Sequence, residues 1–300
     1  MRIGISIRSS HAVDDPRLGA TYMVERARAA RMADLDTLFV GDHHSVPSPY
    51  FQNVAIMGRM LAEWHNKPAG ALFLLPLWNP VLLAEQIGTL AAITPGRFIM
   101  QCALGGDPRQ FAAMGSDISR RVGMFEASLD IMQRLWAGER VSDHRYWPIE
   151  GARISPVPAE PVEVWVGASA EPAIKRSARL AQGWLAGPNL TDDEARHQLQ
   201  LYLQACDTYE CEPRAVALRR DIFIGATSQE AARVKAHYVD KGYRGFGEHA
   251  LLSGSVEEVA SAFRSYAEMG YTDVIVRNFS TDQAEALASI ERLARVRELL

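Results

Sequence analysis

Short apolar runs and longer segments of helical periodicity alternate along most of the chain. Several of the runs are almost continuous in Val, Ile, Leu and Phe, as strands covered on both faces must be. Alternation of this kind is typical of parallel βαβ units. Eight strands are therefore predicted, at Arg2–Ile7, Thr37–Val40, Ala69–Leu75, Arg97–Gln101, Val162–Val166, Gly183–Ala186, Ala217–Ile224 and Thr272–Val276.

The segments between these runs place apolar residues three and four positions apart, which puts them on one face of a helix. Leu83, Ile87 and Leu90 form one such stripe, and it is expected to face the core. Ser255 and Glu258 have the spacing of an N-terminal capping box for a later helix. The pattern thus predicts helices as clearly as strands.

Eight strands with alternating helices predict one α/β domain over residues 1–300, a (β/α)8 TIM barrel with insertion loops, and the length of 300 residues suits it. A doubly wound open sheet is the alternative. It would be expected to carry a glycine-rich turn after the first strand, where this chain has Arg8-Ser9-Ser10-His11. A closing helix is expected within Thr281–Leu300.

Two connections are longer than a simple βα unit needs. Residues 138–161 are expected to form an ordered surface excursion or a subunit contact. Residues 238–254 are rich in glycine, and we expect them to form a mobile cover over the mouth of the barrel.

The composition of the chain argues against nucleic-acid and membrane partners. A formal net charge of −4 supplies no basic field for nucleic acid or for an anionic membrane surface. No apolar run is long enough to span a membrane, and Arg8 interrupts the N-terminal run too early for a signal peptide. Three cysteines make no disulfide framework, so a cytoplasmic location is expected.

Functional groups of a (β/α)8 barrel lie at the C-terminal ends of its strands, and the sharpest polar cluster there is Asp42-His43-His44 after the second strand. These side chains can act as acid, base or hydrogen-bond donor. Adjacent strand residues face opposite ways, so at most one histidine is expected to point into the site. The alternative is that both only support the barrel wall. A metal site would need ligands after later strands, and none follows them, so no metal is predicted.

Small residues follow two further strands. Gly167-Ala168-Ser169 precedes a predicted helix start, which favours an anion site or a plain N-cap. Gly105-Gly106 permits close approach of a ligand or forms a plain turn. Tyr50, Trp78 and Arg277 are candidates for a partly aromatic substrate cavity, or for ordinary packing.

Blocks of sequence in barrel order resemble the bacterial luciferase-like superfamily of flavin- and deazaflavin-dependent oxidoreductases. The resemblance covers nearly the whole chain and rests on Asp36–His44, Gly70–Phe98, Phe125–Glu139, Val164–Trp184 and Gly254–Val276. It implies a luciferase-like barrel that holds a flavin-type ring across its mouth.

The resemblance also implies roles for single residues. His43 or His44 matches a catalytic histidine, and a cis peptide is implied between Ala71 and Leu72, behind the ring. One departure is Gln101-Cys102-Ala103, where the family commonly has a Gly-x-Gly pattern. The implied cofactor contacts are Gly167, Ala168 and Ser169 at the phosphate, Gly105 and Gly106 along the tail, and Ala71 and Leu72 at the ring.

Three functions follow from the resemblance. The first is an FMN-dependent monooxygenase that takes reduced FMN from a separate reductase and acts with oxygen on a small organic substrate. The alternative is a coenzyme F420-dependent reductase or dehydrogenase that transfers a hydride in the same pocket. Asp42 motivates this alternative, for which a separate F420 reductase is the expected partner. A non-catalytic flavin-binding relative is the third, motivated by the altered fourth strand. A homodimer is expected for any of them.

Overall fold

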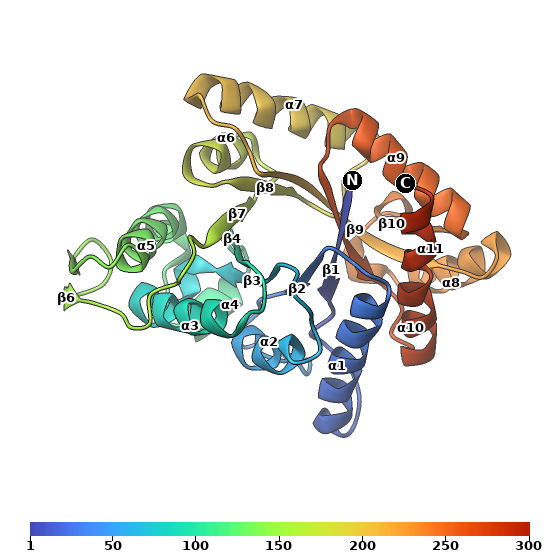
Figure 1. Ribbon diagram of the computed structural model, residues 1–300, viewed down its shortest axis with the longest axis horizontal. Coiled ribbons are helices and arrows are strands. Elements are labelled where there is room, and N and C mark those ends of the chain that lie inside the picture. Colours follow the sequence, from blue (N-terminus) through green and yellow to red (C-terminus); the bar gives the residue numbers. More distant parts are fainter.

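The computed structural model describes residues 1–300 and forms a closed barrel of eight parallel strands surrounded by helices (Figure 1). Each barrel strand pairs with the next, and β11 pairs with β1 to close the ring. The predicted TIM barrel is confirmed. Its strands are β1 (Arg2–Ile7), β2 (Thr37–Val40), β3 (Ala69–Leu74), β4 (Phe98–Ala103), β7 (Glu163–Gly167), β8 (Gly183–Ala186), β9 (Ala215–Ile224) and β11 (Asp273–Asn278).

The helices lie outside the barrel (Figure 1). None of them combines the length and the apolar character that crossing a membrane requires. They are α1 (Pro16–Met32), α2 (Asn53–Leu61), α3 (Pro80–Ile93), α4 (Pro108–Ala113), α5 (Arg121–Trp136), α6 (Glu171–Leu180), α7 (Asp192–Tyr209), α8 (Ser228–Asp240), α9 (Val256–Met269), α10 (Gln283–Glu291) and α11 (Leu293–Glu298).

Local sequence signals predict the buried face of one of these helices and the N-terminus of another. Leu83, Ile87 and Leu90 are buried on one face of α3, as their spacing predicts. The capping box of Ser255 and Glu258 is present at the start of α9. Such a box satisfies backbone N–H groups that would otherwise have no partner in the first turn.

The structure corrects the prediction of one closing helix, because α10 and α11 are separate and meet at Arg292. Arg292 keeps helical backbone angles, and its guanidinium donates to the carbonyl of Ile224 at 2.9 Å. No Gly or Pro marks the break. The sequence therefore carries no signal for it.

Both long connections contain strands that their sequences did not predict. β5 (Val141–Asp143) and β6 (Ile149–Ala152) form an antiparallel hairpin in the first connection. In the second, β10 (Leu251–Gly254) pairs in parallel with the C-terminal part of β9, beyond the stretch of β9 that pairs with β8. These strands hold too few apolar residues to give a periodic pattern.

The core has two layers. A cluster of 63 buried residues fills the space between the strands and the helices. A second cluster of 7 lies within the barrel and consists of Phe39, Ile99, Trp165, Leu185, Ala215, Ala217 and Ile275. Side chains thus fill the barrel interior at this level, and the open space lies at the C-terminal ends of the strands.

The close approach of β3 and β4 depends on Gly70. A Cβ atom at this position would stand 1.8 Å from the backbone oxygen of Ile99. Because backbone cannot move aside as a side chain does, we expect Gly70→Ala to lower the free energy of unfolding by about 3 kcal/mol. Chemical denaturation followed by circular dichroism measures the change.

Gly58 provides the matched control. It lies within α2, and a Cβ there would meet only Ile93 Cδ1, at 4.0 Å. Gly58→Ala should leave stability unchanged or raise it by up to about 1 kcal/mol. Equal losses in the Gly58 and Gly70 variants would contradict the packing argument.

Candidate active site

A cavity of about 570 Å³ opens at the C-terminal ends of β1, β2, β3, β9 and β11. This is a usual size for a small-molecule site, and it is the face of the barrel where such sites occur. Only 6 of its 19 lining residues are hydrophobic. Among the others are residues that the sequence singled out, namely Asp42, His43, Tyr50 and Arg277.

Asp42, in the cavity wall, joins the ends of β2 and β3. Its carboxylate accepts hydrogen bonds from the backbone N–H of Leu74 at 2.8 Å, from Trp78 Nε1 at 2.9 Å and from Asn53 Nδ2 at 3.3 Å. The side chain is fully shielded from solvent. The carboxylate of Asp42 is therefore occupied by protein donors, and its role is to hold the end of β2 against β3.

The two adjacent histidines face different ways, as predicted, although both lie beyond the end of β2. His44 is buried, with Nε2 lying 3.2 Å from Asp42 Oδ1 and its ring edge-on to Trp78. His43 is exposed in the cavity, and its ring lies edge-on to Tyr50. Of the two, His43 is the histidine that can contact a ligand.

Gln110, at the wall of the cavity, sets the tautomer of the neutral His43 ring. The backbone N–H of His44 can only donate, so the atom it meets at 3.0 Å is Gln110 Oε1. The amide nitrogen of Gln110 then donates to His43 Nδ1, at 3.3 Å. In the neutral ring the proton must therefore be on Nε2, which has no partner in the protein.

The cavity walls partly desolvate the His43 ring, which lowers its pKa from the usual value, and the positive charges of Arg244 and Arg277 act in the same direction. The ring is therefore neutral at pH 7 and presents an N–H group to the cavity. Sequence reasoning missed Gln110, because a single amide in a short helix carries no signal of its own.

The implied cis peptide between Ala71 and Leu72 is not present, and that prediction was wrong for this structure. The one cis bond is Ser155–Pro156. β3 keeps regular pairing with β4 through Leu74. Its other edge loses β2 after Ala71, and there the carbonyl of Leu72 accepts from Asn53 Nδ2 at 2.7 Å. A side chain thus completes the hydrogen bonding of an ordinary trans backbone. Ala71 is fully buried, and Leu72 lines the cavity.

The residues predicted at the cofactor's phosphate, after β7, and along its tail, after β4, lie outside the wall of this cavity. Ser169 is not the N-cap of α6, because that position is Ala170, which makes no side-chain cap. The backbone N–H groups of Ser169, Ala170 and Glu171 have no acceptor in the chain. Together with Gly167 and the buried Ala168 they leave an uncapped helix start, which suits an oxyanion.

The two glycines after β4 differ in their surroundings, because a Cβ at Gly105 would stand 3.2 Å from the Phe111 ring. Gly105 has a positive φ of 71°, which favours glycine. A Cβ at Gly106 would meet nothing within 4 Å. Upstream of them, Gln101 and Cys102 are buried within the paired strand. Open space beside this strand end therefore begins at Gly106, after Gln101-Cys102-Ala103, where the sequence departs from the family's Gly-x-Gly pattern.

Of the three predicted substrate contacts, the structure brings Tyr50 and Arg277 to the cavity and leaves Trp78 outside its wall. The indole of Trp78 is engaged with Asp42 and packs edge-on against Phe73. From the second long connection, Tyr243 and Arg244 also reach the cavity. This connection therefore lies where a cover was predicted.

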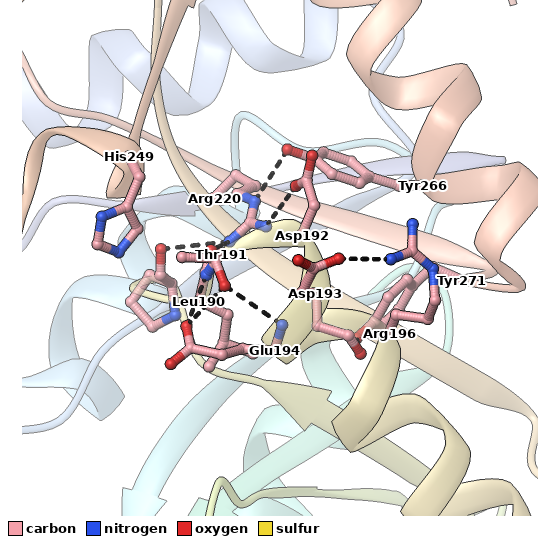
Figure 2. Close-up of polar contacts among 12 residues, drawn as sticks. Leu190, Thr191, Asp192, Asp193, Glu194, Arg196, Arg220, His249, Tyr266 and Tyr271 are labelled. Atoms are coloured by element: carbon pink, nitrogen blue, oxygen red, sulfur yellow. Dashed lines mark hydrogen bonds and ion pairs between the residues drawn. The ribbon is translucent and has the colours of Figure 1, made fainter.

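Sequence reasoning missed two cavity arginines, Arg219 and Arg244. Alternation along β9 sends Arg219 and Asp221 inward and Arg220 outward. Figure 2 shows the outward residue between Tyr266 and the start of α7, where its guanidinium donates to Tyr266 Oη at 3.1 Å. Two consecutive arginines and an aspartate within a buried strand were the available signal.

His11 supplies a pH-dependent contribution to stability beside this site. It is 5% exposed, and its Nε2 lies 3.0 Å from the carbonyl of Arg8. Burial, together with the charge of Arg26, lowers the pKa of His11 to about 4. The unfolded chain takes up this proton near pH 6.5, and the folded chain only near pH 4. Stability should therefore fall by about 3 kcal/mol as the pH drops through that window.

Urea unfolding at pH 7 and at pH 4.5 tests this expectation in the wild type and in His11→Asn. Asparagine can keep a donor near the Arg8 carbonyl but does not titrate. The variant should lose less stability on acidification than the wild type. Identical losses would mean that His11 does not carry the effect.

A model of the family described as luciferase-like monooxygenase matches residues 1–250. An F420-dependent glucose-6-phosphate dehydrogenase from Nakamurella multipartita is 24% identical over 193 residues, covering 60% of this chain and 56% of that protein. The enzyme of the same name from Beutenbergia cavernae is 25% identical over 305 residues, covering 88% of each. An uncharacterized protein from Mycobacterium tuberculosis is 29% identical over 120 residues, 40% of this chain and 41% of that one. In the first and third of these matches the chain spans about half or less of the relative's length.

Solved structures share the whole fold at low identity. A monooxygenase from Streptomyces bottropensis has a TM-score of 0.83 at 17% identity, covering 98% of both chains. The oxygenating constituent of 3,6-diketocamphane monooxygenase from Pseudomonas putida, in complex with FMN, has a TM-score of 0.80 at 18% identity, covering 98% of this chain and 97% of that one. An F420-dependent secondary alcohol dehydrogenase in complex with an F420–acetone adduct has a TM-score of 0.80 at 15% identity, covering 98% of both.

Proposed function

Because the chain belongs to the luciferase-like monooxygenase family, we propose that it is a coenzyme F420-dependent oxidoreductase that transfers a hydride between the coenzyme and a small organic substrate. The observation that carries the choice of coenzyme is the polar lining of the cavity. Arg8, Arg219, Arg244 and Arg277 all contribute to its wall. Chemistry with oxygen on a reduced flavin needs a site that excludes water, whereas hydride transfer to a deazaflavin leaves oxygen alone.

Two further observations support this choice. Asp42 follows the second strand, where the resemblance associates an Asp-His pair with deazaflavin enzymes, whereas the paired histidines that follow it are typical of FMN members. The curated relatives with assigned activities named above are F420-dependent. An F420 reductase is a possible partner for regenerating the coenzyme.

An FMN-dependent monooxygenase is the second candidate. It is favoured by the description of the family and by the FMN complex among the structures of the same fold. It would take reduced FMN from a separate reductase. The sequence alone placed this function first, and the charged cavity reverses the order. In either case the predicted homodimer is part of the proposal, and sedimentation of the purified chain tests it.

The residues present fit either coenzyme. We propose that the uncapped start of α6, with Gly167, Ala168 and Ser169, holds its phosphate, and that Gly105 and Gly106 lie along its tail, with open space beside Gly106. The bound coenzyme supplies or accepts the hydride.

His43 acts on the substrate in this proposal. Its Nε2–H is fixed toward the cavity because Gln110 occupies Nδ1. A neutral imidazole held in this way donates a hydrogen bond to a substrate oxygen and stabilises the negative charge that develops there. This role is narrower than the acid or base that the sequence suggested. Asp42 holds the strand end from which His43 projects.

Oxygen uptake separates the candidate functions. The purified chain is mixed with reduced F420 or with reduced FMN, and oxygen is followed with an electrode. The F420 proposal predicts no protein-dependent oxygen consumption with either coenzyme and turnover of F420 with organic substrates. Protein-dependent uptake with reduced FMN would favour the monooxygenase. If both coenzymes bind without any turnover, the non-catalytic alternative stands.

A further inference from the structure

The cavity holds an excess of positive charge that the chain as a whole lacks. Arg8, Arg219, Arg244 and Arg277 line it, while the formal net charge of the protein is −4. Four guanidinium groups in one cavity repel one another unless carboxylates or a bound anion compensate them.

Carboxylates compensate this charge only in part. Asp221 is completely buried, accepts from Arg244 Nη1 at 3.0 Å and lies 3.5 Å from Arg219 Nη2. Asp42, in the wall, accepts from the Leu74 backbone and from Trp78, and its other oxygen lies 3.2 Å from His44 Nε2. Asp107, at the rim, pairs with Arg109 at 3.1 Å. Asp42 and Asp107 line the cavity, but Asp221 is the one carboxylate that forms an ion pair with any of the four arginines, and Arg8 and Arg277 have no ion-pair partner.

Several donors of these arginines are free. The Nε atoms of Arg219 and Arg277 are buried and have no partner, and Arg8 Nε meets only the carbonyl of Ser10, at 2.8 Å. Burial, reinforced by the other arginines, lowers the pKa of Arg219 to about 10. An anion bound among these guanidinium groups would offset their charge and relieve the repulsion.

We propose that the substrate of this enzyme carries an oxyanionic group, a phosphate, sulfonate or carboxylate, and that Arg8, Arg219, Arg244 and Arg277 bind it. This inference rests on the proposed function and names the class of its substrate. Arginine suits the task because its planar fork of donors matches the geometry of such groups. His43 lines the same cavity, so an anchored substrate would lie in the space that His43 borders.

The coenzyme is the other possible source of an anion, since FMN and F420 both carry phosphate. The structure favours the substrate because unpartnered backbone N–H groups lie at a separate place, the start of α6. The experiment therefore needs one arm for each source.

Inorganic phosphate is the probe for the first arm, titrated into the coenzyme-free chain by calorimetry. We expect saturable binding, weakened about tenfold or more in Arg219→Gln and in Arg277→Gln. Arg196→Gln is the control, because Arg196 is exposed on α7 and pairs with Asp193 outside the barrel (Figure 2). Absence of phosphate binding in the wild type, or equal binding in all variants, overturns the proposal.

A measurement on the wild type covers the case in which the variants do not fold. Phosphate should slow the modification of Arg244 and Arg277 by phenylglyoxal, read out by peptide mass spectrometry, and leave Arg196 unaffected. Equal modification with and without phosphate overturns the proposal.

The second arm compares coenzymes with and without their phosphate in Arg277→Gln. FMN is set against riboflavin, and F420 against its chromophore without the phosphate tail. The proposal predicts that the variant binds each pair with the same ratio of affinities as the wild type. A selective loss for the phosphorylated forms would assign the arginines to the coenzyme and overturn the proposal. Phosphate binding without binding of any coenzyme would instead refute the proposed function alone.

Discussion

Replacing Asp42 with alanine is expected to lower the free energy of unfolding by about 3–5 kcal/mol. The carboxylate is shielded from solvent and accepts from the Leu74 backbone, Trp78 and Asn53. Its removal leaves these donors without that acceptor where water does not reach. Because Asp42 also holds the end of β2, we expect His43 to lose its fixed position and coenzyme turnover to fall as well. Denaturant unfolding of the apo chain measures the stability.

Two further variants complete the test of Asp42. Asp42→Asn keeps one acceptor oxygen and should lose a smaller part of the stability. Asp193→Ala removes a carboxylate that is 96% exposed and paired only with Arg196, and it should change stability by less than about 0.5 kcal/mol. Our interpretation fails if Asp42→Ala is as stable as the Asp193 variant.

Removing the imidazole of His43 should lower kcat by about 10²–10³-fold and leave the affinity for the coenzyme nearly unchanged. The expected loss is that of a single positioned hydrogen-bond donor at a charge-developing oxygen. Turnover is followed by the absorbance of F420 with any organic substrate that the wild type converts. His43→Gln, which retains a donor, should recover part of the rate.

The pH profile separates a fixed donor from a titrating acid or base. Since partial desolvation lowers the pKa of His43, the ring is neutral above pH 6.5, and the rate should not titrate with His43 between about pH 6.5 and 9. His249→Ala is the control, because His249 is bound to the carbonyl of Asn189 away from the cavity. A titration in this range that disappears in His43→Gln would assign proton transfer to His43 instead.

The sequence predicted the barrel well because its strands are buried on both faces and its helices carry regular apolar stripes. Both signals are local, and β2 and β8 have the predicted bounds. The short strands β5, β6 and β10 escaped prediction because pairing with distant segments, rather than their own pattern, makes them strands.

The candidate site was predicted less completely. Asp42 and His43 stand at a strand end, where barrel geometry directs attention, and the expectation that adjacent residues face opposite ways separated His43 from His44. Gln110 and Arg244 escaped because nothing local distinguishes them, and only the folded chain brings them to the cavity. Trp78 follows a strand, yet its indole turns toward Asp42.

The central claim is that the cavity at the mouth of the barrel binds a redox coenzyme, and equilibrium binding of F420 and of FMN tests it most directly. The measurement compares the wild type with Leu72→Trp, which adds bulk at the cavity wall, and with Leu203→Trp, on the exposed side of α7. We predict that F420 binds the wild type and Leu203→Trp equally and binds Leu72→Trp at least about tenfold more weakly. Failure of both coenzymes to bind the wild type at millimolar concentration, or equal F420 binding by all three proteins, would contradict the account.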